Sequence, residues 1–331
     1  MEQSNGNTST IKLTTRNDLS LLYRCLRTVI RPFRPRLVTP GKPQPAGSPK
    51  LKRPKSKCEI QERKACNVYL YDFHPADHGP HPLSPRAEQH HIFYFAGGGF
   101  QSPPSSEHWK LCDELCSQLR EFCQITIVSY PLAPNSPAAE SLPMLQKWLN
   151  AEMATAMAKN RKITLMGDSA GGNVVLSLAF WWAGQTNTKT EGRSPLVNVF
   201  AISPATDLRN QNLGITEANK HDPVLSVGLT TDVGRKWAGA LGTDDPSVSP
   251  NLADFNLLRQ CKVRTHGVVG THDVLAPDAI LFRELLAKHQ ISGEWLQWEG
   301  QMHCFPLASV YGLREGKDGR DWIIDVLKRN V

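Results

Sequence analysis

The sequence predicts an α/β fold, in which a mainly parallel β-sheet is flanked by helices on both faces. Short apolar segments typical of strands alternate with longer helix-like segments over most of the chain, and this alternation favours parallel strands joined by helical crossovers. The 331 residues are 40% hydrophobic and 21% charged, as expected for one large domain with an extensive core. The chain shows no internal repeat and no second core.

The predicted strands are short runs of apolar and β-branched residues. They cover residues 67–71, 92–95, 124–129, 162–166, 197–202, 263–269 and 294–298. The predicted helices are longer segments between them, at residues 107–122, 138–157, about 173–182 and 279–286. Upstream of residue 58 we expect no strand. Residues 1–17 are polar and are predicted to be disordered, and residues 17–30 fit a short amphipathic helix. Residues 31–57 are rich in Pro, Lys and Arg and are predicted to form an irregular connector.

The net charge of +7 is unevenly distributed. Residues 1–64 contain 15 Lys/Arg against 4 Asp/Glu, whereas the rest of the chain contains 23 against 27. The N-terminal arm is therefore basic and the main body mildly acidic. We interpret the arm as a solvated lead-in, with contact to a membrane surface or nucleic acid as the alternatives. Because the arm lacks interleaved aromatic residues, we expect no nucleic-acid partner.

Cysteine usage indicates the cytoplasm, because eight cysteines without a secretory signal in the first twenty residues favour reduced thiols. Cys112 and Cys116 lie one helical turn apart without a second pair at metal-binding spacing, so we expect no zinc site. His74, His78 and His81 are interpreted as solvated turn residues rather than metal ligands. The sequence predicts no cofactor.

No apolar stretch reaches the roughly 18 residues that a membrane-spanning helix requires, so we expect no integral membrane segment. The longest apolar run, residues 173–184, is predicted to be a buried helix. For the oligomeric state the sequence leaves a monomer and a homodimer open.

Ser169 lies in the pattern G-x-S-x-G, within Gly167-Asp168-Ser169-Ala170-Gly171. An apolar strand precedes this segment and a helix follows it, which is the strand–turn–helix setting of a nucleophile elbow. The sharp turn requires small neighbours and exposes the serine Oγ at the end of the sheet. We therefore predict that Ser169 is a catalytic nucleophile.

A serine nucleophile requires a histidine to accept its proton and an acid to orient that histidine. In chains with this elbow the order is serine, acid, histidine. Asp273 follows the predicted strand at residues 263–269 and is the favoured acid. Asp278 is the competing candidate, but it lies at the start of a helix and is more typical of a first-turn charge.

His303 follows the last predicted strand and is the favoured base, because a loop at that place can bring an imidazole over the sheet edge. His266 lies inside a predicted strand and His272 adjoins the acid, so both suit the role less well. Ser169, Asp273 and His303 form the predicted catalytic triad.

Acyl transfer also needs hydrogen-bond donors for the oxyanion of the tetrahedral intermediate. The segment Phe95-Ala96-Gly97-Gly98-Gly99-Phe100 follows a predicted strand, and glycines allow backbone N–H groups to approach a substrate carbonyl. The amide of Ala170, directly after the nucleophile, would complete such an oxyanion hole.

From about residue 66 onward, the chain resembles the hormone-sensitive-lipase-like branch of the α/β hydrolases. The resemblance rests on the three-glycine motif, the elbow Gly167-Asp168-Ser169-Ala170-Gly171-Gly172, Tyr130-Pro131-Leu132-Ala133-Pro134, Asp273-Val274-Leu275 and His303-Cys304-Phe305. The resemblance implies an α/β-hydrolase fold and oxyanion-hole amides at Gly98, Gly99 and Ala170. It also implies a cap over the site, formed by roughly residues 15–60 and 208–240. We therefore expect two parts in the chain: a basic arm with a cap element (1–60) and a catalytic domain (61–331).

Two positions depart from the family pattern. Ala96 replaces the histidine that leads the three-glycine motif, and Cys304 replaces a usual glycine. The first change leaves the backbone donors in place but removes a side chain that could fix the loop. The Phe-Ala-Gly-Gly-Gly-Phe form and the basic arm are more loosely similar to fungal members of the branch in secondary-metabolite pathways.

The sequence thus predicts a cofactor-independent serine carboxylic-ester hydrolase acting on a small apolar molecule. Amide or lactone hydrolysis, and condensation or cyclisation of a pathway intermediate, remain alternatives. A small-molecule receptor on the same fold is a third alternative, disfavoured because all three triad candidates are present. Trp181, Trp182, Trp237, Phe100 and Phe305 are interpreted as core residues rather than substrate contacts.

Overall fold

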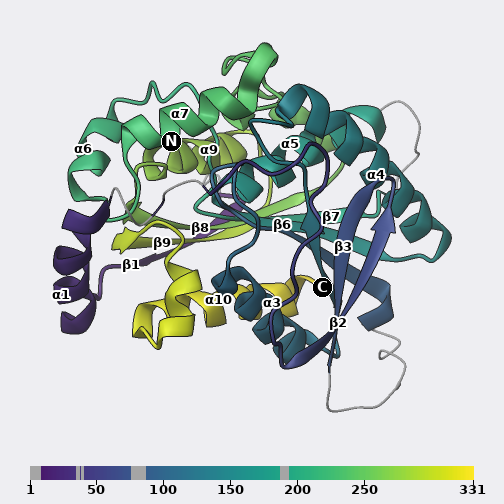
Figure 1. Cartoon of the computed structure of the whole chain (residues 1–331), viewed down its shortest axis with the longest axis horizontal. Coiled ribbons are helices and arrows are strands. Elements are labelled where there is room, and N and C mark those ends of the chain that lie inside the picture. Colours follow the sequence, from purple (N-terminus) through teal and green to yellow (C-terminus); the bar gives the residue numbers. More distant parts are fainter. Residues whose placement is uncertain (1–8, 35–37, 39–40, 76–86, 187–193) are drawn as a thin grey trace, which may run out of the picture.

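The computed structural model describes residues 9–34, 38, 41–75, 87–186 and 194–331. Its centre is a nine-stranded sheet in the order β1-β9-β8-β7-β6-β4-β5-β3-β2 (Figure 1). The strands are β1 (Ile11–Arg16), β2 (Cys58–Ala65), β3 (Val68–Pro75), β4 (His90–Phe95), β5 (Gln124–Ser129), β6 (Lys162–Asp168), β7 (Leu196–Ile202), β8 (Arg264–His272) and β9 (Gly293–Met302). All neighbouring pairs are parallel except β2–β3 and β3–β5. The predicted α/β-hydrolase architecture is confirmed.

Helices cover both faces of the sheet, as expected for parallel strands joined by crossovers. The described helices are α1 (Leu21–Ile30), α3 (Ser106–Leu119), α4 (Ala138–Ala158), α5 (Ser169–Thr186), α6 (Gly214–His221), α7 (Val227–Ala238), α8 (Phe255–Gln260), α9 (Ala276–Lys288) and α10 (Arg314–Asn330). In Figure 1, α3 and α10 lie below the sheet, whereas α5, α7 and α9 lie above it. Two hydrophobic cores result, one on each face.

The central strand β4 is buried along its whole length although it begins with two histidines. His90 Nε2 lies 2.7 Å from the Thr164 hydroxyl of β6, and His91 Nε2 lies 2.7 Å from the Thr126 hydroxyl of β5. Each imidazole therefore has a neutral partner on a neighbouring strand, which offsets part of the cost of burying it. Burial lowers the pKa of both histidines far below the usual range.

All seven predicted strands are present, but two further strands were missed. The prediction of disorder for residues 1–17 is wrong at Ile11–Arg16, where β1 pairs in parallel with β9 and covers the edge of the sheet. The backbone of β9 supplies the hydrogen-bond partners that this polar segment could not find alone. The division of the chain near residue 60 stays a prediction.

Strand β2 was missed because its sequence, CEIQERKA, is largely charged. It forms a hairpin with β3 through Cys66 and Asn67, both of which have positive φ, 48° and 68°. Two consecutive positive φ angles are typical of a tight turn between antiparallel strands. Only Cys58 and Ile60 of this strand face the core, so the apolar alternation is too short to stand out.

The apolar run at residues 173–184 lies within α5, which packs in the core as predicted. Among the described helices, none has the length and apolar character needed to cross a membrane.

His266 in β8 should make the fold sensitive to acid. Burial lowers the pKa of His266 to about 4. Its Nδ1 accepts a hydrogen bond from the Glu294 amide at 3.1 Å, so protonation would place two donors face to face. The unfolded chain binds this proton below pH about 6.5, and stability is therefore lost as the pH falls from about 6.5 towards 4.

Replacing His266 with glutamine should flatten this pH dependence, because glutamine does not titrate. Between pH about 7.5 and 4, the wild type should lose roughly 3 kcal/mol more unfolding free energy than H266Q. Urea unfolding at a series of pH values measures the difference. Parallel curves for the two proteins would contradict the assignment.

Candidate active site

Ser169 lies at the junction where β6 ends and α5 begins, with a positive φ of 51°. A positive φ is unusual for serine and marks a sharp turn that lifts the side chain out of the sheet. The turn needs glycine at its far side, since a Cβ on Gly171 would lie 2.0 Å from the Phe95 carbonyl oxygen. The strand–turn–helix setting predicted for Ser169 is therefore present.

Asp273 and His303 approach one another from the ends of two neighbouring strands, β8 and β9. Asp273 Oδ2 lies 2.7 Å from His303 Nδ1, and both side chains are buried, with exposed fractions of 0% and 9%. Burial disfavours the charged imidazolium, but the adjacent Asp273 carboxylate outweighs it and raises the pKa of His303 well above its usual range. With Nδ1–H donating to the carboxylate, Nε2 of the neutral ring is left to accept a proton.

Ser169 and His303 line the same cavity, but no hydrogen bond joins their side chains. Instead, His303 Nε2 lies 3.4 Å from the Sγ of Cys304. The Cys304 backbone is left-handed, with φ 48°, and burial raises the pKa of its thiol to about 12. The thiol is therefore protonated at neutral pH. Catalytic hydrogen bonds are often long in the absence of substrate, so this geometry is compatible with proton transfer from Ser169.

The alternative acid and bases lie elsewhere. Asp278 is in the first turn of α9, where burial and the nearby Asp207 raise its pKa to about 7. His266 is bonded within the sheet, and His272 Nδ1 lies 2.7 Å from the guanidinium of Arg27. Among the described residues, Asp273 is the carboxylate bonded to His303.

The three-glycine segment is held to the elbow by Asp168. The Gly97 amide donates to Asp168 Oδ1 at 2.9 Å, and the Tyr94 hydroxyl donates to the same oxygen at 2.6 Å. Gly98 and Gly99 have positive φ, 131° and 59°, and within the described part of the chain their amides donate to no protein acceptor. The Gly98 and Gly99 amides, like that of Ala170 in the first turn of α5, are therefore free to bind an anionic oxygen.

His108 is a site residue that the sequence analysis missed. Its Nδ1 accepts from the Ser105 amide at 2.9 Å at the start of α3, and its Nε2 lies 3.2 Å from Asp168 Oδ2. Burial opposes ionisation of Asp168, but His108 and the other donors lower the pKa of this carboxyl below its usual value. Asp168 and His108 therefore fix the glycine segment without the family histidine that Ala96 replaces. The sequence feature that could have identified His108 is the spacing Ser105-x-x-His108, which is typical of a capped helix N-terminus.

Asp222, at the end of α6, is a second residue that was missed. Its Oδ1 accepts from the amides of Val224 and Leu225 at 2.7 and 2.8 Å, and its Oδ2 accepts from the Val274 amide at 2.8 Å. Burial and the nearby Asp273 raise the pKa of Asp222 to about 6. One buried carboxyl therefore joins the loop that carries Asp273 to the segment after α6.

A cavity of about 430 Å³ opens beside these groups. Most of its wall is apolar and comes from the segments around α6 and α7 and from the loops after β4, β8 and β9. The residues concerned include Phe100, Leu208, Val224, Leu225, Leu229, Val233, Leu275 and Leu307. Trp181, Trp182, Trp237 and Phe305 are not among the lining residues, whereas Phe100 is. The predicted cap segments contribute Val38 and the stretch from Leu208 to Val233.

Within the described residues, no group of three or more His, Cys, Asp or Glu side chains is placed to hold a metal ion. The prediction that His74 is a solvated turn residue is wrong, because His74 lies in β3, opposite Glu59 of β2, and is half-buried. His78 and His81 lie outside the described residues, so their interpretation stays a prediction. All eight cysteines are free thiols in the structure.

A model of the alpha/beta hydrolase fold matches residues 92–307 of the chain. The chain belongs to the α/β-hydrolase family. The matched region begins in β4 and ends just beyond His303, so it contains the glycine segment, the elbow and both loops that carry the candidate acid and base.

Several relatives of this α/β hydrolase are known. An esterase of Acinetobacter venetianus is 26% identical over 221 residues, which cover 66% of this chain and 69% of the esterase. A triacylglycerol lipase of Mycobacterium tuberculosis is 26% identical over 233 residues, or 70% of this chain and 45% of the lipase. Human hormone-sensitive lipase is 28% identical over 177 residues, covering 53% of this chain but only 16% of that protein.

The fold is also found in carboxyl esterase 2 of the mycorrhizal fungus Tuber melanosporum. That structure matches with a TM-score of 0.76 at 17% identity and covers 95% of this chain and 100% of its own. At this identity the similarity shows the fold alone. Together with the hormone-sensitive lipases, these relatives confirm the resemblance to the hormone-sensitive-lipase-like branch.

In this α/β hydrolase, Asp222→Asn should destabilise the loop that carries Asp273. The amide offers one accepting oxygen where the carboxylate serves three N–H donors, so at least one buried donor loses its partner. Urea unfolding at neutral pH should show a loss of about 1–3 kcal/mol in unfolding free energy. Asp254→Asn is the matched control, because it replaces an exposed N-cap of α8 with an equally good cap. Equal stability of D222N and wild type would refute this role.

Proposed function

We propose that the chain hydrolyses the carboxylic ester of a small apolar molecule through an acyl-enzyme formed on Ser169. The observation that carries the proposal is the buried 2.7 Å contact between Asp273 and His303, on the same cavity as the strained serine of the elbow. The family and its relatives support the coarser assignment directly: the chain is an esterase/lipase-type α/β hydrolase and a carboxylic-ester hydrolase.

In the proposed first step, His303 Nε2 accepts the Ser169 hydroxyl proton while Oγ attacks the ester carbonyl carbon. Asp273 accepts a hydrogen bond from Nδ1–H and stabilises the imidazolium that forms. The imidazolium then protonates the leaving alcohol as the C–O bond breaks, which leaves the acyl group on Ser169. Water, deprotonated by His303, then attacks the acyl carbon. The bond from that carbon to Ser169 Oγ breaks, the imidazolium returns the proton to Oγ, and the carboxylic acid leaves.

The amides of Gly98, Gly99 and Ala170 are proposed to bind the oxyanion of both tetrahedral intermediates. Their fixed orientation supports this role, since Asp168 occupies the Gly97 amide and holds the segment against the elbow. Donors positioned before the reaction stabilise developing charge without reorganising, and losing one costs about 10²–10³-fold in turnover.

The proposed substrate is uncharged and largely apolar. No lysine or arginine is among the described residues that line the cavity. The Asp207 carboxylate at the wall is already paired with Arg209 at 2.6 Å, and Glu107 is bonded to the Tyr311 hydroxyl. A phosphorylated or highly anionic substrate would thus find no lysine or arginine on the described wall, whereas an acyl chain or ring would contact leucine and valine side chains.

We also propose a cellular location, a pathway role and a cap for this protein. Free cysteines throughout the chain support a cytoplasmic location, because oxidising compartments favour disulfides. The Phe-Ala-Gly-Gly-Gly-Phe segment supports a role in secondary-metabolite biosynthesis through its likeness to fungal pathway esterases. We propose that residues 208–240, with part of the N-terminal 60 residues, form the cap.

A fluorophosphonate probe tests the nucleophile. The wild type should be labelled once per chain, and Ser169→Ala should lose both the label and about 10³-fold or more of its ester hydrolysis. Intact-mass spectrometry measures the labelling. Ser177→Ala, which removes a buried hydroxyl from the same helix α5, is the matched control and should retain the label.

Two outcomes would contradict the proposal. A well-folded wild type that is not labelled would mean that Ser169 is not activated, and would favour the receptor alternative. Loss of activity in His303→Ala together with full activity in Ser169→Ala would favour condensation or cyclisation without an acyl-enzyme. Amide and lactone substrates in the same assay test the remaining alternative.

The pH profile tests the proposed base. His303 must be neutral to accept a proton, and its pKa is raised by Asp273, so kcat/KM should fall with decreasing pH along a limb centred above pH 6.5. In Asp273→Asn the carboxylate charge is removed, and the limb should move to lower pH. The rate of fluorophosphonate inactivation as a function of pH measures both limbs. An unmoved limb would show that another group controls it.

The cavity wall tests the substrate class. Leu229→Trp adds bulk on α7 and should shift acyl preference from hexanoyl towards acetyl esters by about tenfold in the ratio of kcat/KM values. Leu213→Trp changes a side chain that is 93% exposed and outside the cavity, and should leave the ratio unchanged. An unchanged ratio in L229W would place the acyl chain elsewhere.

A further inference from the structure

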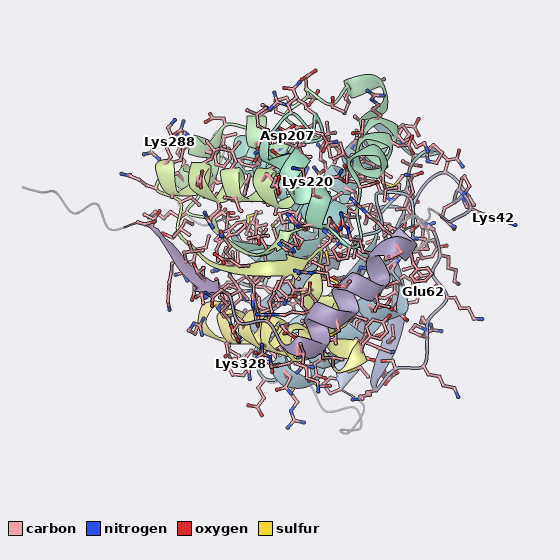
Figure 2. All side chains as sticks on the ribbon, turned by 90° about the vertical axis from the view of Figure 1, so that its left-hand side faces the viewer. Lys42, Glu62, Asp207, Lys220, Lys288 and Lys328 are labelled. Atoms are coloured by element: carbon pink, nitrogen blue, oxygen red, sulfur yellow. The ribbon has the colours of Figure 1, made fainter. Side chains whose placement is uncertain are left out.

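Helix α1 packs with its apolar face turned away from the protein. Leu21, Leu22 and Val29 are 77%, 67% and 62% exposed, and Phe33 in the following 3₁₀ turn is 52% exposed. Cys25 is also exposed. At 3.6 residues per turn these side chains share about one third of the helix circumference. Figure 2 shows α1 in the foreground of the molecule, with no other element in front of it.

The opposite side of α1 binds the protein through polar groups. The Tyr23 hydroxyl accepts from the Met302 amide at 2.8 Å, and the Arg27 guanidinium donates to the Gly300 carbonyl at 3.1 Å. Arg34, just beyond the helix, donates to the Asn219 side chain at 2.6 Å. Surface helices normally bury their apolar stripe and expose their polar residues. In α1, Leu21, Leu22 and Val29 are exposed instead, and no element among the described residues covers them, so this apolar face is available to a partner outside the chain.

The charges beside this apolar face are positive. Arg24 is exposed along one flank of it, and Arg31, also exposed, donates a hydrogen bond to the Lys220 carbonyl of α6. The whole stretch of residues 19–58 contains eleven Lys/Arg and no Asp or Glu. On the neighbouring helix α6, Glu217 is already paired with Lys220 and His221. An apolar face flanked by cations is complementary to anionic headgroups above hydrocarbon chains.

A second copy of this chain is a poorer partner. A symmetric contact would place α1 against α1 of the partner, because the same patch faces itself across a two-fold axis. That contact would bring arginines together without an acidic residue on either helix. Exposed arginines beside a lipid surface can instead extend to the phosphate groups while their stems cover hydrocarbon.

We propose that α1 is an interfacial helix through which the protein binds the surface of an anionic lipid bilayer. Leu21, Leu22, Val29 and Phe33 enter the headgroup–acyl boundary, and Arg24 contacts lipid phosphates. This binding is independent of the proposed hydrolysis. Tyr23 and Arg27 join the same helix to the segment that leads into His303, so the bound lipid surface would lie beside the candidate base.

Vesicle flotation of the full-length chain tests the proposal. The wild type should float with vesicles of phosphatidylcholine and phosphatidylserine, and about tenfold less with phosphatidylcholine alone. The double substitution Leu22→Ser and Val29→Ser should lower binding to the anionic vesicles by at least about tenfold. Arg24→Glu should lower binding several-fold, and added salt should weaken binding of the wild type more than that of R24E.

Matched controls distinguish an effect of the apolar face of α1 from a general effect of surface hydrophobicity or charge. Leu213→Ser removes an apolar side chain that is 93% exposed on another segment, and Lys159→Glu reverses an exposed charge beyond α4. Both should bind as the wild type does. Thermal unfolding verifies that the variants are folded, as expected for exposed positions. Equal loss in the controls, or equal binding of the wild type to neutral and anionic vesicles, would overturn the proposal.

A polarity-sensitive dye on Cys25 gives a readout that needs no substitution in α1. Cys25 is the exposed cysteine, so a maleimide dye reacts there first, and its emission should shift to the blue with anionic vesicles. A dye on Leu213→Cys in a Cys25→Ser background should not shift. An unshifted Cys25 dye would overturn the proposal. Analytical sedimentation without lipid gives a second test. A wild-type dimer that becomes a monomer in the Leu22→Ser, Val29→Ser variant would also overturn the proposal.

Discussion

The parallel pairing of β8 with β9 is the constraint on which the candidate site depends. Because the strands run side by side in the same direction, the loops that follow them leave the sheet at one edge. Asp273 follows β8 by one residue and His303 follows β9 by one residue, and their side chains meet at 2.7 Å. Parallel β6, two strands away, delivers Ser169 to the same edge. Residues up to 134 positions apart in the sequence thus meet at one edge of the sheet through strand direction, and Ser169 and His303 line one cavity there.

Buried carboxylates hold the surrounding backbone in place. Asp168 binds the glycine segment through the Gly97 amide, and Asp222 binds the loop after Asp273 through the Val274 amide. Each buried carboxylate costs desolvation energy that is offset by several N–H or O–H donors. Several of these donors are backbone amides beside the catalytic candidates. The buried carboxylates therefore fix the glycine segment and the loop after β8 to the core. A flexible glycine segment becomes a fixed array of amides in this way.

Much of this architecture could be predicted from sequence, and the reason lies in local patterns. The strands β4 to β9 are apolar runs between helix-like segments, and Gly167 to Gly172 lies between a strand and a helix, so both could be recognised within a short window. Asp273 and His303 could be placed because each follows a strand end. Strand β1 could not be predicted, because its polar sequence forms a strand only through pairing with β9 at the edge of the sheet.

His108 and Asp222 illustrate the same limit at the site. Their partners, Asp168 and Val274, are 60 and 52 residues away along the chain, and no local pattern connects them. The outward apolar face of α1 was also beyond sequence analysis. The spacing of Leu19, Leu22, Leu26 and Ile30 predicted an amphipathic helix correctly, but three of these four are partly buried in the structure. The outward face is formed by Leu21, Leu22, Val29 and Phe33, of which the pattern singled out only Leu22.

Trapping the acyl-enzyme tests the central claim most directly. The chain would be mixed with an excess of a p-nitrophenyl ester, quenched in acid within the first turnovers, digested and analysed by mass spectrometry. Ester hydrolysis through Ser169 predicts a mass increase equal to the acyl group on the peptide that contains Ser169. Rapid product formation with no acyl adduct on that peptide, or with an adduct on another residue, would contradict the account.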